Sequence, residues 1–214
     1  MSIYDLQYSD VIYHFDRVRF ISTYDVQSLQ EFVPVRYLLE NTNSDHIIKH
    51  HNGRKTSDGK PNWYKSKVDA VCCNDEFMEI LDTCTEPQPS GKPKFVISKI
   101  EIAKDLTFDN FDNAYAYEQW FLKNVERKFT RKRWYNKGIL YLGKSSADDD
   151  SKHYFRAYVC NSKVTGEPCY HSEFVIEGGD LIKKRIRNEF GVTKLTDAMS
   201  LYLALDKKFL RYAM

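Results

Sequence analysis

Three stretches decide the fold of this chain: Lys99-Ile-Glu-Ile-Ala-Lys-Asp105, His153-Tyr-Phe-Arg-Ala-Tyr-Val159 and His171-Ser-Glu-Phe-Val-Ile-Glu177. Side chains alternate in character along each of them, which is the period of a β-strand with two different faces. The alternation predicts three strands with these chemically useful faces: Lys99, Glu101, Ala103 and Asp105; Tyr154, Arg156, Tyr158 and Cys160; and His171, Glu173, Val175 and Glu177.

These faces together offer carboxylates, an arginine, a histidine and tyrosines. Carboxylate oxygens hold hard divalent cations, and such a cation polarises a phosphodiester that a tyrosine phenol attacks. The combination therefore favours metal-assisted phosphoryl transfer through a tyrosyl intermediate. Taken singly, each stretch also fits an ordinary antiparallel sheet with one solvated face.

The same stretches resemble the rolling-circle replication initiators, in the branch shared by plasmid initiators and the replication initiation proteins of filamentous phages. The resemblance covers roughly the second half of the chain and follows the family's order. Its three blocks are Ile97 to Asp105, Leu140 to Gly143 followed by Phe155 to Tyr158, and Glu173 to Glu177. It implies an antiparallel sheet with helices packed on one face and the active site on the open sheet face.

Individual roles follow from positions within these blocks. The resemblance implies that Glu101 and Glu173 are acidic metal ligands and that Tyr158 is the nucleophile. Asp105 and Glu177 are further metal candidates on the same strands. The implied cofactor is Mg²⁺ or Mn²⁺.

Four neighbouring residues have expected supporting roles. Arg156 and Lys163 would neutralise the pentavalent phosphorane, although the family's tyrosine strand reaches its lysine sooner than this one does. His171 shares a face with Glu173 and would complete the metal site or orient the phenol; a surface histidine at a strand entry is the alternative. Tyr154 is the rival nucleophile because it shares the face of Tyr158.

The His-hydrophobic-His pair of the better-known branch of these endonucleases does not occur in the sequence. His50 and His51 are adjacent, so a strand would point them to opposite faces, and their flanking residues are typical of a loop. Solvated loop histidines are expected there.

A cationic stretch precedes the Leu140 strand. Its members are Arg127, Lys128, Arg131, Lys132, Arg133, Trp134, Tyr135 and Lys137. Cations neutralise phosphates and aromatic rings stack on unpaired bases, so the stretch is predicted to bind DNA. A second basic group at 183–187 is expected mainly to form the solvated face of a helix. The net charge of +2 argues against a surface that binds nucleic acid all over.

Composition sets further bounds. A chain of 214 residues with 42% hydrophobic content can bury one core, so residues 1–214 are expected to form a single domain with a break near 86–93. Five cysteines without a Cys-x-x-Cys pair indicate a reduced intracellular protein, and buried thiols are favoured over zinc at Cys160 and Cys169. No long apolar run and no leader at Met1 are evident, which favours the host cytoplasm and no membrane.

The remaining periodicities predict strands at 11–21, 63–73 and 138–143. They predict helices at 26–32, 76–82 and 110–128, one from 179, and one from about 196 to the terminus. Strands joined mostly as hairpins, with helices inserted, indicate an α+β fold built on an antiparallel sheet.

The expected function is sequence-specific, metal-dependent nicking and joining of DNA that starts rolling-circle replication of a small phage or plasmid. Single-stranded or hairpin origin DNA is the expected partner, and a host helicase and polymerase are further candidates. Two alternatives use the same residues differently. One is a non-catalytic single-strand nucleic-acid binding protein, and the other is a nuclease in which Glu101, Asp105 and Glu173 hold a metal that activates water.

Overall fold

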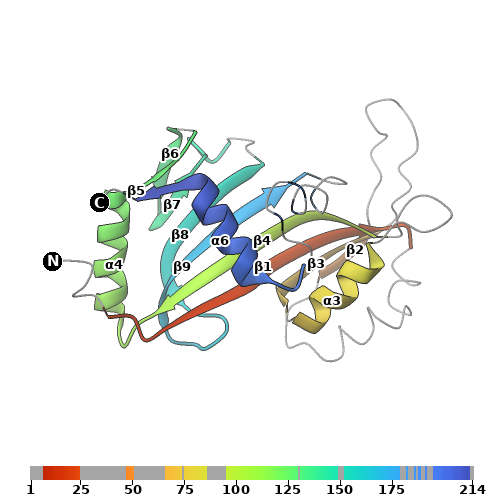
Figure 1. The fold of residues 1–214 in the computed structure, drawn as a ribbon, viewed down its shortest axis with the longest axis horizontal. Coiled ribbons are helices and arrows are strands. Elements are labelled where there is room, and N and C mark those ends of the chain that lie inside the picture. Colours follow the sequence, from red (N-terminus) through yellow and green to blue (C-terminus); the bar gives the residue numbers. More distant parts are fainter. Residues whose placement is uncertain are drawn as a thin grey trace. The chain divides into compact units, whose positions relative to one another are not determined.

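The computed structural model has an α+β fold with antiparallel strand pairs, as predicted (Figure 1). It describes residues 7–24, 47–50, 66–73, 75–85, 95–129, 131–148, 152–178, 182, 186, 188, 191 and 195–212. The helix predicted at 26–32, the break at 86–93 and most of the basic group at 183–187 lie outside these residues. The chain forms two compact units, residues 1–14, 101–176 and 198–214 in the first and residues 15–100 and 177–197 in the second. The expected single domain stays a prediction.

The first unit is built on antiparallel strands in the hydrogen-bonded order β1-β4-β9-β8-β7-β6. The unit contains the first residues of β1 (Asp10–Ser22) and the last residues of β4 (Phe95–Thr107). The other strands are β9 (Pro168–Glu177), β8 (His153–Asn161), β7 (Ile139–Leu142) and β6 (Arg133–Asn136). Long strands that are paired on both sides give this sheet a rigid centre, because every backbone polar group there finds a partner. The predicted pairing of the His153 and His171 stretches is confirmed as β8 and β9.

Two helices cover the same face of this sheet. Helix α4 (Phe111–Asn124) stacks Phe121 on Phe155 and also contacts Tyr170, with ring centroids 5.7 and 5.1 Å apart. Helix α6 (Ala198–Phe209) contacts Phe174 through Tyr202, at 5.2 Å between centroids. Tyr117 and Phe121 of α4 are buried in this core, and the opposite face of the sheet carries the polar residues of β8 and β9.

Both helices end earlier than the sequence predicts. The helix expected over 110–128 stops at Asn124, because residues 125–127 form β5 (Val125–Arg127). The helix expected to reach the terminus stops at Phe209 and is followed by β10 (Leu210–Tyr212). Strands β5 and β10 pair with each other. The helical periodicity of each segment could not predict this strand pairing, because the two partners lie far apart in the sequence.

The second unit has the strand order β2-β3-β1-β4, with β2 (Ile47–His50), β3 (Ser66–Cys73) and the remaining parts of β1 and β4. Helix α3 (Asp75–Cys84) confirms the predicted helix at 76–82 and contacts Phe20 through Phe77, at 6.3 Å between ring centroids. The expectation that His50 lies in a loop is wrong, because His50 ends β2 and pairs with Ser66, while the loop predicted after it lies outside the described residues. His51 lies outside the described residues.

Gly143 ends β7 in a conformation that favours glycine. Its φ is +100°, and its N–H donates a 2.8 Å hydrogen bond to the carbonyl of Lys132. A Cβ at this position would collide with the guanidinium of Arg127. That guanidinium donates hydrogen bonds of 3.1 and 2.8 Å to the carbonyls of Leu142 and His153, so it cannot move without cost.

We therefore expect Gly143→Ala to lower the free energy of unfolding by about 1–3 kcal/mol. Gly138→Ala is the matched control, because Gly138 has a φ of +79° but open space around its Cα. Urea unfolding of both variants separates backbone strain, which they share, from displacement of Arg127. Equal losses in the two variants would contradict the collision with Arg127.

Candidate active site

Asp105 stands at the centre of a buried polar cluster on the face of the first unit opposite α4 and α6. It lies near the end of β4, between β1 and β9. Tyr13 of β1 contacts Tyr202 of α6, which turns the next residue, His14, to the other face. There the rings of His14 and His171 lie 6.0 Å apart.

The contacts of Asp105 are short and come from three elements. His171 Nδ1 donates to Oδ1 at 2.6 Å, and the Ser162 hydroxyl donates to Oδ2 at 2.6 Å. His14 Nε2 lies 3.5 Å from Oδ2, an ion-pair distance that does not meet hydrogen-bond geometry. Asp105 is fully buried, at 0% exposure. A carboxylate in such a place requires these partners to remain ionised.

Arg156 holds two further buried carboxylates. It faces Glu173 across the β8–β9 pair, and its Nε donates to Glu173 Oε1. Its Nη2 lies 3.3 Å from Glu101 Oε2. Glu101 and Glu173 are both 0% exposed, so the solvated sheet face expected as the alternative is wrong at these residues. The expected open face is likewise not open at its carboxylates.

Electrostatics keep the cluster charged. Burial alone would raise the pKa of Asp105, but the nearby His14 ring and the hydrogen bonds from His171 and Ser162 hold it below its ordinary value. Burial alone would lower the pKa of His171, but its hydrogen bond to Asp105 and the negative charges of Asp105 and Glu173 raise it to about 10. Burial opposes the charge of Arg156 as well, but Glu173 and Glu101 raise its pKa. In the metal-free protein His171 is thus an imidazolium at neutral pH, and binding of a cation through its Nε2 would require loss of the proton there.

Tyr158 lies beside this cluster and Tyr154 does not. Tyr158 stands opposite His171 in the β8–β9 register, with ring centroids 5.0 Å apart, and is partly exposed. Tyr154 stands opposite Val175, is 9% exposed, and carries Lys144 Nζ 4.3 Å above its ring. A nucleophile must reach both its activating groups and its substrate, which the position of Tyr158 allows.

The cluster has the donor atoms of a metal site. One ligand atom from each of His14, Asp105 and His171 lies within 4.8 Å of the others. In the part of the chain that the structure describes, both ring nitrogens of His14, Nε2 of His171 and Oε2 of Glu173 are buried without a hydrogen bond. Buried polar atoms without partners are costly, so their convergence fits a divalent cation.

His14 is a candidate metal ligand that the sequence did not reveal. Its strand was predicted, but nothing in the sequence places that strand beside β4 and Asp105. Glu177, predicted as a metal candidate, belongs to the second unit, where it is 38% exposed and forms a 3.2 Å ion pair with Lys99 Nζ. Lys163 lies in the exposed turn between β8 and β9.

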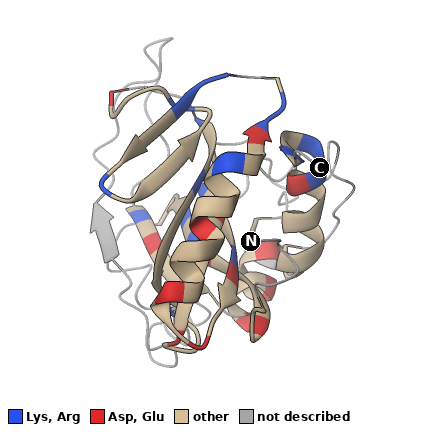
Figure 2. Cartoon of the chain, turned by 90° about the vertical axis from the view of Figure 1, so that its left-hand side faces the viewer, with Lys and Arg blue, Asp and Glu red and all other residues tan. Residues whose placement is uncertain are grey.

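The cationic stretch gathers at the C-terminal end of α4 and along the chain that leads to β6 (Figure 2). Several of its members also stabilise the fold. Arg133 donates to the carbonyls of Leu122 and Val125, where α4 ends, and Lys128 donates to Lys207 at the end of α6. Cations at helix C-termini interact favourably with the last carbonyls.

Trp134 and Tyr135, which were predicted to stack on bases, differ in how accessible their rings are to a ligand. The ring of Trp134 is itself stacked on Tyr141, with centroids 4.8 Å apart, whereas Tyr135 is 48% exposed. Lys137, with a φ of +49°, lies with Gly138 in the tight turn between β6 and β7. Of these residues, Tyr135 and Lys137 are more accessible to a ligand than Trp134.

The fold is similar to that of a solved rolling circle replication initiator protein from Geobacillus stearothermophilus. The two share 11% sequence identity with a TM-score of 0.54, and the match covers 95% of this chain and 87% of that one. At this identity the likeness shows the fold alone. No protein-family model and no curated protein sequence matches the chain. Among the described helices, none has the length and apolar character that a membrane span requires.

Proposed function

We propose that this protein is a metal-dependent endonuclease that nicks and rejoins DNA to start rolling-circle replication. The observation that carries the proposal is the position of Tyr158, partly exposed and facing a buried cluster of histidines and carboxylates. The similarity in fold to a rolling circle replication initiator adds support. The host cytoplasm and a helicase and polymerase of the host belong to the same proposal.

His14, Asp105 and His171 are the proposed metal ligands. Glu173 Oε2 makes no hydrogen bond to any described residue, and Glu173 offers a ligand atom near one of His171, so it is a further candidate donor. This set differs from the one the sequence predicts, since Glu101 and the other oxygen of Glu173 bind Arg156. When bound, the cation supplies Lewis-acid polarisation of the scissile phosphate.

Tyr158 then acts as the nucleophile. Its phenolic oxygen loses its proton to solvent and attacks phosphorus, the bond to the 3′ oxygen breaks, and that oxygen takes up a proton from solvent. The products are a 5′-phosphotyrosine and a free 3′-hydroxyl. The phosphotyrosine ester conserves the bond energy for later rejoining. Arg156 is already bound to two carboxylates, so we assign it a positioning role, and Lys163 is the candidate cation for the phosphorane.

Single-stranded or hairpin origin DNA is the proposed substrate. Arg131, Lys132 and Arg133 are exposed at the start of β6 and belong to the same unit as Tyr158. Their phosphate contacts would fix the register of the DNA, because phosphate contacts position a strand without reading its sequence.

The ligand set predicts which substitutions weaken metal binding. Two imidazoles with a carboxylate suit Mn²⁺ better than Mg²⁺, which prefers oxygen ligands. We expect His14→Ala and Asp105→Asn each to lower Mn²⁺ affinity by about 100-fold or more, since changes outside the ligand shell already cost 10–100-fold. Isothermal titration of the full chain with MnCl₂ measures this directly.

Glu177→Gln is the matched control, because Glu177 pairs with Lys99 and is expected to leave Mn²⁺ affinity unchanged. Circular dichroism of each variant shows whether the fold is retained. If Glu177→Gln weakened Mn²⁺ binding while His14→Ala did not, the proposed ligand set would be wrong and the one expected from the sequence would be favoured.

A further inference from the structure

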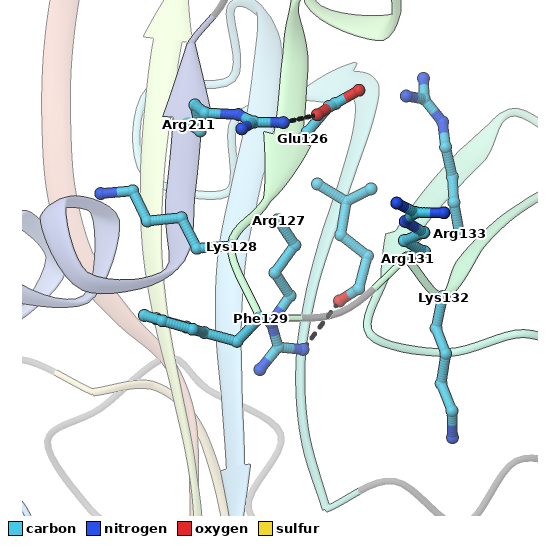
Figure 3. A pocket seen from close by; sticks show the side chains of 9 residues that line it. Glu126, Arg127, Lys128, Phe129, Arg131, Lys132, Arg133 and Arg211 are labelled. Carbon is cyan, nitrogen blue, oxygen red and sulfur yellow. Dashed lines mark hydrogen bonds and ion pairs between the residues drawn. The ribbon is translucent and has the colours of Figure 1, made fainter.

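A pocket of about 800 Å³ opens in the first unit where β5, β6 and β10 approach one another (Figure 3). Six cations line it: Arg127, Lys128, Arg131, Lys132, Arg133 and Arg211. Among the described lining residues Glu126 is the one carboxylate, so six positive charges face one negative charge. We call it the basic pocket. Arg211 comes from the C-terminal strand and was not among the DNA-binding residues predicted from the sequence.

Backbone carbonyls hold three of the cations of the basic pocket in place. Arg127, Lys128 and Arg133 donate to backbone carbonyls, which satisfy their hydrogen bonds but carry no net charge. Arg211 is the member that pairs with the carboxylate of Glu126. Clustered cations of this kind create a potential that attracts anions, and oriented guanidinium groups suit phosphate oxygens.

Phe129 gives the basic pocket a second, apolar feature. Its side chain is 86% exposed, and its backbone has a φ of +63°, in the left-handed region that residues other than glycine rarely adopt. Figure 3 shows it on the side of Lys128, with Arg131, Lys132 and Arg133 across the pocket. An aromatic ring held in water by a strained backbone marks a place where a ligand is expected.

We propose that the basic pocket binds single-stranded DNA, with backbone phosphates at Arg131 and Lys132 and an unpaired base stacked on Phe129. Cations beside an exposed aromatic ring are the two features by which proteins bind unpaired nucleotides. Inorganic phosphate would gain nothing from Phe129, and paired bases in a duplex would not reach its ring. The choice of DNA as the nucleic acid rests on the proposed function.

The basic pocket is a separate element from the nicking centre, and neither site shares a residue with the other. Its expected role is to hold one segment of the displaced or extruded strand while another segment reaches Tyr158. In the basic pocket Phe129 thereby takes the stacking role that the sequence assigned to Trp134 and Tyr135. The ring of Trp134 already packs on Tyr141, and Tyr135 is not among the described residues that line the pocket.

The test measures binding without cleavage. A labelled oligothymidylate of about ten nucleotides, within the usual site size, is titrated with the full chain in metal-free buffer and followed by fluorescence anisotropy. Phe129→Ala is expected to weaken binding by about 5- to 150-fold and to leave binding of a duplex of equal length unchanged. Phe129→Trp is expected to restore binding of the single strand. Tyr115→Ala, at an aromatic residue that is 52% exposed on α4, is the matched control and should bind like wild type.

Arg131→Ala tests the phosphate contact independently of Phe129. It is expected to lower the salt dependence of single-strand binding by about 0.7 in the slope of log affinity against log salt. Wild-type affinity in both variants would overturn the proposal, as would equal losses on single strand and duplex in Phe129→Ala. Complete competition by inorganic phosphate together with wild-type affinity in Phe129→Ala would reassign the pocket to free anions. These binding experiments contain no metal and therefore do not depend on nicking. The proposal for the basic pocket can thus fail while the proposed nicking function stands, and the reverse is also possible.

Discussion

Tyr158→Phe is expected to abolish the covalent protein–DNA product, with a loss of cleavage and joining of at least about 10³-fold. The variant removes the phenolic oxygen that would attack phosphorus but keeps the ring that lies 5.0 Å from His171. The metal ligands are untouched, so Mn²⁺ affinity should not change. Labelled single-stranded oligonucleotides tiled across the protein's own replicon, incubated with Mn²⁺ and run on a denaturing gel, reveal the adduct.

Tyr154→Phe is the matched control for this experiment. It removes the same oxygen from the same strand, but from a buried residue beneath Lys144, so the adduct should persist. An adduct that is lost in Tyr154→Phe and kept in Tyr158→Phe would reverse the assignment of the nucleophile. Cleavage by wild type without any adduct would indicate the hydrolytic nuclease, and binding without cleavage would indicate the single-strand binding protein.

Arg156→Met is expected to lower the free energy of unfolding by about 3–5 kcal/mol. The substitution keeps most of the side-chain volume but removes the cation from Glu101 and Glu173, which are both fully buried. Removing one partner from a buried ion pair is costly because the other charge remains out of water. Urea unfolding, followed by circular dichroism and tryptophan fluorescence, measures the loss.

The triple variant Arg156→Met, Glu101→Gln, Glu173→Gln separates charge from packing. It removes all three charges of the group, so most of the stability lost in Arg156→Met is expected to return. Arg156→Lys retains the charge without the planar fork and should fall between wild type and Arg156→Met. A loss below about 1 kcal/mol in Arg156→Met would show that this ion-pair group does not stabilise the fold.

The faces of β8 and β9 could be predicted because they depend on local geometry. Strand side chains alternate with period two, and the two strands are neighbours in the sequence. The grouping of Arg156 with Glu173, and of Tyr158 with His171, is confirmed by the register of this pair. The α+β class follows in the same way from the alternation of strand and helix patterns.

The place of His14 in the proposed metal-ligand set could not be predicted, because it depends on which distant strands become neighbours, whereas Asp105, His171 and Glu173 were predicted from the sequence. His14 lies near Asp105 only because β1 pairs beside β4, and no local pattern encodes that choice. The premature ends of α4 and α6 have the same origin, since β5 and β10 pair over a long separation. Burial could not be predicted either, because a carboxylate in an alternating strand gives the same sequence pattern whether its side chain faces water or is 0% exposed.

The sequence by itself determined the strands β4, β8 and β9 and their faces, because backbone sterics and side-chain period act over a few residues. The candidate nucleophile Tyr158, with Tyr154 as its rival, followed from the resemblance to the initiators. Tertiary structure alone decided that Asp105 meets His14 and His171, that Arg156 binds two buried carboxylates, and that Glu177 pairs with Lys99. These outcomes depend on long-range strand pairing and on exclusion of water, which arise only when the whole sheet forms.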